Sequence, residues 1–177
     1  MHAVPAVAAA ALVSAGASAQ LYFVDTIVDF SDASVFGSGI VTGPPDAGGY
    51  YFPDTASSQA FITLAFLDLP AFTDGEGADL RIFDLETNAS DPLEAAQVFV
   101  SADGVDFFFA GSVIGGSSEG FIDLADQGLT GAYRYIRIVH VDLGTGDGLD
   151  VDAVAYFHPV PAPGLPAALR TAALAAR

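Results

Sequence analysis

The 177-residue chain has no cysteine, no lysine and only three histidines. Without cysteine it cannot rely on disulfides for stability. Nucleophilic catalysis requires a base beside the nucleophile, and His140 is the one histidine in the middle of the chain, since His158 borders a proline-rich tail. His140 ends a predicted strand, where a histidine satisfied in the core or at an edge is commoner than a catalytic one. We therefore expect a protein that is not an enzyme.

Positive charge is equally scarce, with five arginines against 22 acidic residues and a formal net charge of −17. Such a surface repels phosphate backbones and anionic lipid heads, which argues against nucleic acid and membrane surfaces as partners. It attracts cations instead. Solubility or a salty medium would also explain the charge, but neither requires acids to cluster beside glycines in loops, as several do here.

The remaining composition predicts one globular all-β domain. Hydrophobic residues make up 52% of the chain, with 14 Phe and 6 Tyr, so there is ample material for a core. The 19 glycines and 10 prolines interrupt the apolar segments at short intervals, which is typical of a sandwich or barrel with many turns.

Both ends differ from this pattern. Residues 1–19 resemble a secretory signal peptide, with an apolar run from Ala3 to Val13 and a small-residue cleavage site at 17–19, which predicts an exported protein whose domain spans residues 20–158. The usual basic start is missing, so an alanine-rich helix is the alternative. Residues 159–166 form a stiff proline-rich linker, and the segment from Leu165 to Ala176 is too short to span a bilayer.

The middle of the chain predicts about eight short strands. Residues 60–66 alternate in the period-2 pattern of a strand with one face in the core. Similar apolar segments, bounded by Gly, Asp or Ser, cover residues 21–30, 80–85, 96–101, 107–113, 121–124, 133–141 and 151–157. Without an alternating helical pattern, this spacing favours an antiparallel β-sandwich of the jelly-roll type.

Five segments resemble known motifs in the same order: GPPDA at 43–47, DGEGADLRIFD at 74–84, SADGVDF at 101–107, AYRYIRI at 132–138 and LDVDAV at 149–154. Together they resemble discoidin-like, galactose-binding-like jelly rolls of bacterial exported proteins. The tail from Pro159 onward is similar to PEP-CTERM and VPLPA-CTERM sorting tails, although Arg170 interrupts its apolar run. The alternative is that the tail is a frayed end or a short amphipathic helix. The resemblance implies a jelly roll, export and calcium, and no established activity. Asp84 and Leu149 depart from the motifs, which usually have Glu and Phe there.

The acidic loops supply candidate calcium ligands. Calcium takes six to eight oxygens, and the loop from Asp74 to Asp79 offers three carboxylates separated by glycines. A solvated turn is the alternative, because Asp and Gly are also ordinary turn residues. A second cluster precedes the last predicted strand, and through the resemblance it would join the loop at 43–47 and tie the first and last parts of the sandwich together. The candidate metal ligands are Asp46, Asp74, Glu76, Asp79, Asp84, Asp150 and Asp152.

The sequence leaves the role of the domain open among three classes. Discoidin-like folds commonly bind carbohydrate or other surface ligands through loops, and Tyr50, Tyr51 and Phe52 are the candidate stacking residues. The alternative for these aromatics is that alternate members enter the core. The rival class is a structural protein of the envelope or biofilm matrix, and a carboxylate-based glycosidase is a third possibility.

Overall fold

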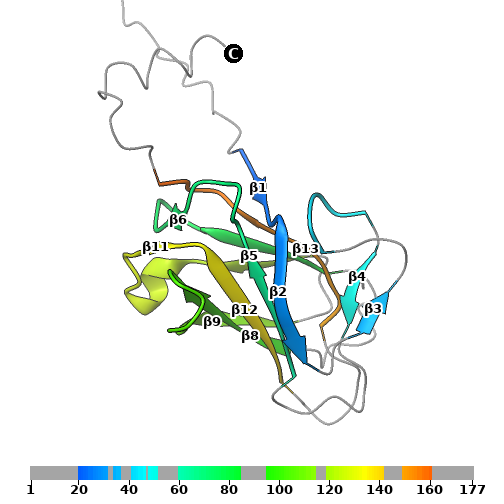
Figure 1. Cartoon of the computed structure of the whole chain (residues 1–177). Coiled ribbons are helices and arrows are strands. Elements are labelled where there is room, and N and C mark those ends of the chain that lie inside the picture. The colour runs from blue at the N-terminus through cyan, green and yellow to red at the C-terminus, as the bar shows by residue number, and fades with distance from the viewer. Residues whose placement is uncertain are drawn as a thin grey trace, which may run out of the picture.

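The computed structural model describes residues 20–31, 34–36, 41–46, 48–51, 60–84, 95–114, 119–141 and 149–160. The expected signal peptide and the tail beyond Val160 lie outside these residues, as does Phe52. The described residues form an antiparallel β-sandwich of the jelly-roll type, in which two sheets stack face to face (Figure 1).

The first sheet has five strands in the order β2-β5-β12-β8-β9. Their bounds are Thr26–Ser31, Phe61–Ala65, Tyr135–Val141, Ala95–Ser101 and Phe108–Ile114. All four pairings are antiparallel, and strand β12 lies at the centre.

The second sheet has the order β10-β7-β13-β4-β3, with β1 also paired to β13. Its strands are β1 Tyr22–Phe23, β3 Ser34–Phe36, β4 Gly49–Tyr51, β7 Leu80–Asp84, β10 Glu119–Ile122 and β13 Val151–Tyr156. A small third sheet pairs β6 (Phe72–Thr73) with β11 (Ala132–Tyr133).

Alternation along the strands builds the core. On β12, Ile136 and Ile138 are fully buried, whereas Arg137 between them is only partly buried and faces outward. The second sheet contributes Ile82 and Tyr156 from the opposite side. The Tyr156 ring packs edge-on against Phe66, at 4.8 Å between centroids. Aromatic contacts therefore join the two layers, which is the expected result of a sequence rich in Phe and Tyr.

The fold prediction is confirmed, with corrections at the level of strands. The predicted strand at 21–30 is divided between β1 and β2, and the one at 133–141 between β11 and β12, and in each case the two parts belong to different sheets. The described residues contain eight strands of four or more residues, and the additional ones have only two or three: β1, β3, β4, β6 and β11. The predicted strand at 121–124 ends too late. The strand itself stops at Ile122, and residues Leu124–Gln127 form a 3-10 helix, η1, because the Asp123 side chain accepts the N–H of Ala125 and caps it.

The chain remains attached to the domain through Val160. Thr73 N–H donates to the carbonyl of His158 at 3.0 Å, and Val160 N–H donates to the carbonyl of Ala71 at 2.6 Å. Pro159 forms an isolated antiparallel bridge with Phe72. These contacts extend the small sheet at β6 and bring His158 beside the loop that starts at Asp74. Within the part of the chain described, no helix has the length and apolarity needed to cross a bilayer.

Candidate metal site

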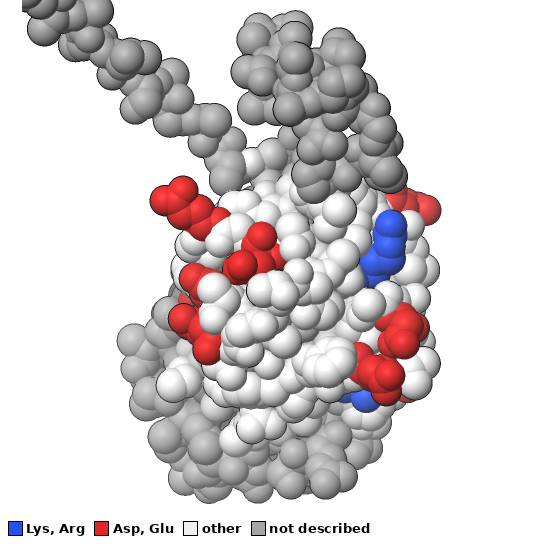
Figure 2. Space-filling model, turned by 90° about the vertical axis from the view of Figure 1, so that its left-hand side faces the viewer, with Lys and Arg blue, Asp and Glu red and all other residues white. Residues whose placement is uncertain are grey.

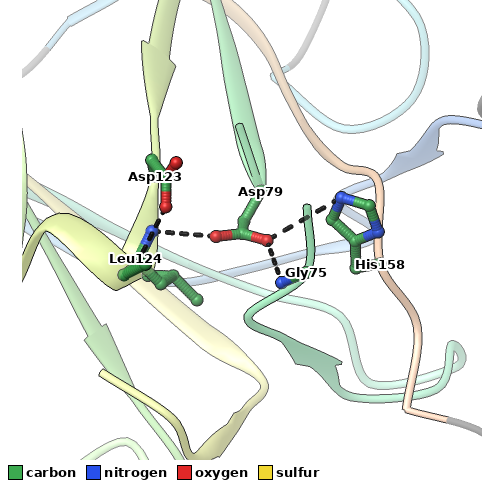
Figure 3. A network of polar contacts seen from close by, with 6 residues as sticks. Gly75, Asp79, Asp123, Leu124 and His158 are labelled. Atoms are coloured by element: carbon green, nitrogen blue, oxygen red, sulfur yellow. Dashed lines mark hydrogen bonds and ion pairs between the residues drawn. The ribbon is translucent and has the colours of Figure 1, made fainter. Parts of the chain in front are cut away.

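Asp79 is the most constrained acidic side chain of the described residues, because it is fully buried directly before β7. Its Oδ1 accepts the N–H of Gly75 at 2.8 Å and its Oδ2 accepts the N–H of Leu124 at 2.8 Å (Figure 3). Its backbone is also engaged, since Asp79 N–H donates to Ile122 O and Asp79 O accepts from Phe157. One carboxylate therefore connects the loop before β7 to the turn after β10.

The electrostatics of Asp79 reflect this burial. Desolvation raises the pKa of its carboxyl above the ordinary 3.8, and the nearby Asp74 carboxylate raises it further. The two backbone hydrogen bonds and His158 act in the opposite direction. His158 Nε2 lies 3.9 Å from Asp79 Oδ1, a long contact for an ion pair. Burying a carboxylate in this way is costly unless a positive partner compensates.

Two further carboxylates converge on Asp79. One oxygen from each of Asp74, Asp79 and Asp123 lies within 4.8 Å of the others. Asp123 Oδ1 accepts the N–H of Ala125 at 2.9 Å, which orients its side chain. Asp74 Oδ1 is buried and has no hydrogen-bond partner within the part of the chain that the structure describes. Three convergent carboxylates, one with an unsatisfied buried oxygen, are chemically suited to a hard divalent cation such as calcium or magnesium.

This cluster contains only part of the predicted first site. Asp74 and Asp79 were both predicted from the loop sequence, whereas Glu76 is exposed and does not join them. Asp123 was missed, because a strand was expected to run through it. The available signal was its place as the capping residue directly before a short helix, since Asp is among the preferred N-cap residues.

The second predicted cluster is brought together in part. Asp46 N–H donates to Asp152 Oδ1 at 3.1 Å, and Asp152 is buried, so the early loop contacts the last strand as expected. Asp84 is paired in register with Val151 next to Asp152, but its side chain lies outside the described residues. Asp150 is half-buried at the start of β13. A metal at this second position remains a prediction.

The predicted ligand-binding aromatics are placed only by their backbone. Tyr50 and Tyr51 lie in β4, where Tyr50 is paired with Val151 of β13 and Val35 of β3. The structure describes only the backbone of Tyr50 and Tyr51, and Phe52 lies outside the described residues. Their predicted contact with a ligand stays a prediction.

Charge on the molecule is uneven. Acidic side chains gather toward both margins of the face shown in Figure 2, while the area between them is mostly uncharged. Basic side chains are few on this face, in keeping with the net charge of −17. A cation approaching the surface is therefore favoured electrostatically over an anion.

Comparisons with known proteins add little to this geometry. No protein-family model matches the chain, and no curated protein matches it. Among solved structures, the chain is similar to a GH26-CBM35 β-(1,4)-mannanase of Podospora anserina, with 17% identity and a TM-score of 0.37. The match covers 81% of this chain and 28% of that protein. A likeness this weak supports no conclusion on function.

Proposed function

We propose that this chain is an exported, non-catalytic binding module whose loops are held by a calcium ion at Asp74, Asp79 and Asp123. The observation that carries the proposal is that one oxygen from each of the three carboxylates lies within 4.8 Å of the others, and that the Asp74 carboxylate has a buried oxygen with no hydrogen-bond partner among the described residues. Calcium is preferred to a transition metal because the three side chains offer only oxygen.

The role proposed for the ion is structural. The three ligands come from the loop before β7, from the residue directly before β7 and from the cap of η1, so one ion would join two loops where β7 begins. In a chain with no cysteine, a bound ion supplies a cross-link that a disulfide cannot. His158 adjoins the same loop, so the ion would also fix the point where the C-terminal segment leaves the domain.

The non-catalytic part of the proposal is supported by the histidines. His140 is 5% exposed on β12, and its backbone N–H donates to Ala60 O. His158 faces the buried Asp79 rather than a hydroxyl nucleophile. His140 is therefore packed among core residues, and His158 is directed at a buried carboxylate. The proposed activity is therefore binding, with carbohydrate as the ligand class that the jelly-roll resemblance implies.

Calorimetric titration of the purified protein with calcium tests the metal proposal. We expect binding at this cluster to disappear in Asp123→Asn, since Asn caps a helix as well as Asp does but supplies a neutral ligand. Glu76→Gln is the matched control, because Glu76 lies in the same loop but is exposed and outside the cluster. Unchanged calcium binding in Asp123→Asn would refute the site. Loss of binding in Glu76→Gln would point to a different set of ligands.

A further inference from the structure

The three arginines of the described residues are engaged in different ways. Arg81 forms an ion pair with Glu119. Arg134 donates through Nη1 to the carbonyls of Phe66 and Leu69, at 3.1 and 2.7 Å. Both guanidinium groups therefore have structural acceptors within the domain.

Arg137 differs from both. Its Nε donates to Thr63 Oγ1 at 2.8 Å, and its guanidinium lies 4.5 Å from the ring centroid of Phe61 and 4.1 Å from that of Phe107. Within the described residues, its two terminal nitrogens make no hydrogen bond and no carboxylate lies within ion-pair distance. In a chain with 22 acidic residues and five arginines, this leaves a positioned set of N–H donors available to a ligand.

Arg137 lies at the centre of a row that crosses the whole five-stranded sheet. Strand register places Thr63 on one side of it and Phe99 on the other, with Asp29 beyond Thr63 and Phe109 beyond Phe99. Residues directly opposite one another share a face of the sheet. The row lies on the side of the sheet away from the core, since the neighbours of Arg137 on β12 are buried in the core, although Thr63 within the row is itself buried.

The row combines three kinds of contact surface. The rings of Phe99 and Phe109 form an edge-to-face pair with centroids 5.6 Å apart, and Phe109 is 39% exposed. Arg137 supplies hydrogen-bond donors, and the exposed Asp29 carboxylate supplies acceptors. A pyranose presents an apolar C–H face to aromatic rings and hydroxyls that both donate and accept, so it matches all three.

We propose that the outer face of the five-stranded sheet, centred on Arg137, binds a neutral saccharide. This inference rests on the proposed binding function and moves the ligand to this face from Tyr50 and Tyr51, which lie in β4 of the other sheet. A neutral ligand is favoured over an anionic one because Asp29 is part of the row and the molecule carries a net charge of −17. The same charge disfavours a second copy of the chain as the occupant.

Affinity electrophoresis of the full-length protein tests the site, in gels containing soluble glucan, mannan, xylan or, as the anionic arm, polygalacturonate. We expect at least one neutral polysaccharide to retard the protein, with the apparent affinity at least tenfold weaker in Arg137→Gln. Arg81→Gln is the matched control, because its guanidinium also lies over Phe rings, those of Phe83 and Phe121, but is paired with Glu119. Phe109→Ser tests the same face without altering the arginine, should Arg137→Gln not fold.

The other outcomes separate this inference from the function on which it rests. Retardation that survives in Arg137→Gln and Phe109→Ser but is lost in Tyr51→Ala would overturn the sheet-face site and keep a saccharide-binding module. Retardation by polygalacturonate alone would overturn the neutral ligand. No retardation in any gel would overturn the saccharide altogether, while calcium binding measured by calorimetry would remain a separate result.

Discussion

Replacing Asp74 by asparagine should stabilise the protein without calcium and weaken it with calcium. Asp74 and Asp79 bring carboxylate oxygens to within 4.8 Å of each other, and no described residue donates a hydrogen bond to Asp74 Oδ1 that would offset the repulsion. At this distance two full charges repel by about 3.5 kcal/mol with an effective dielectric constant of about 20. Because Asp74 is partly exposed, solvent screening reduces the net gain to about 1 kcal/mol. That corresponds to a rise of roughly 2–4 °C in the unfolding midpoint in chelator.

Calcium should reverse the order of the two proteins. The wild-type protein at 100 times its dissociation constant gains about 2.7 kcal/mol from the ion, and the variant loses most of this gain. Differential scanning calorimetry in chelator and in saturating calcium measures both values. Glu76→Gln is the control, and we expect it to follow the wild type in both buffers because its side chain is exposed and outside the cluster. If Asp74→Asn unfolds below the wild type in chelator, or still responds fully to calcium, the reasoning is refuted.

Three further predictions follow from described contacts. Burial raises the folded-state pKa of Asp79 above 3.8, so the folded chain binds this proton more readily than the unfolded chain. In chelator, the contribution of Asp79 to stability is therefore greatest below pH 3.8 and declines as the pH rises through the folded-state pKa. Calcium affinity, measured by calorimetry, should fall as the pH is lowered through the same range. Burial raises the pKa of Tyr156 to about 12, so the free energy of unfolding should fall as the pH rises from about 10 to 12. Tyr156→Phe removes the 2.7 Å hydrogen bond to Pro70 O; it should abolish that fall and lower the free energy of unfolding in urea at pH 7 by about 1 kcal/mol. Gly120→Ala should lower the free energy of unfolding in urea by about 1–3 kcal/mol, because a Cβ there would meet Val113 Cγ1 at 2.5 Å. A variant as stable as the wild type would contradict this close contact between β9 and β10.

The long strands could be predicted from sequence because their apolar residues alternate over five or more positions. The strand at 60–66 and the strand at 133–141 pair with each other in the five-stranded sheet, and each was recognised from its own pattern. The two-residue strands β6 and β11 carry no such signal. Their positions depend on contacts with residues far along the chain, including the bridge from Phe72 to Pro159.

The candidate site could be predicted only where its residues are close in sequence. Asp74 and Asp79 belong to one glycine-rich loop, and that local density of acids identified them. Asp123 is 44 residues beyond Asp79 (123 − 79), and the pairing of β7 with β10 brings it to the same place. Glu76 shows the converse, since it is close in sequence to Asp74 and Asp79 but is exposed and lies outside the cluster.

The surroundings of Arg137 could not be predicted from the sequence for the same reason. Its strand was predicted, but its lateral neighbours Asp29, Thr63, Phe99 and Phe109 come from four other strands. Only the register of the finished sheet aligns them into one row. A pattern of alternate residues identifies the outward face of a strand, and it does not identify what lies beside each residue.

The central claim, that the acidic loops form a calcium site, is tested most directly by the thermal unfolding midpoint of the purified protein in calcium, in magnesium and in chelator. We expect calcium at 100 times its dissociation constant to raise the midpoint by roughly 5–10 °C, and magnesium to raise it much less, because magnesium gives up its water ligands reluctantly. Equal midpoints in all three conditions would contradict the site and leave the negative charge as a feature of the surface alone.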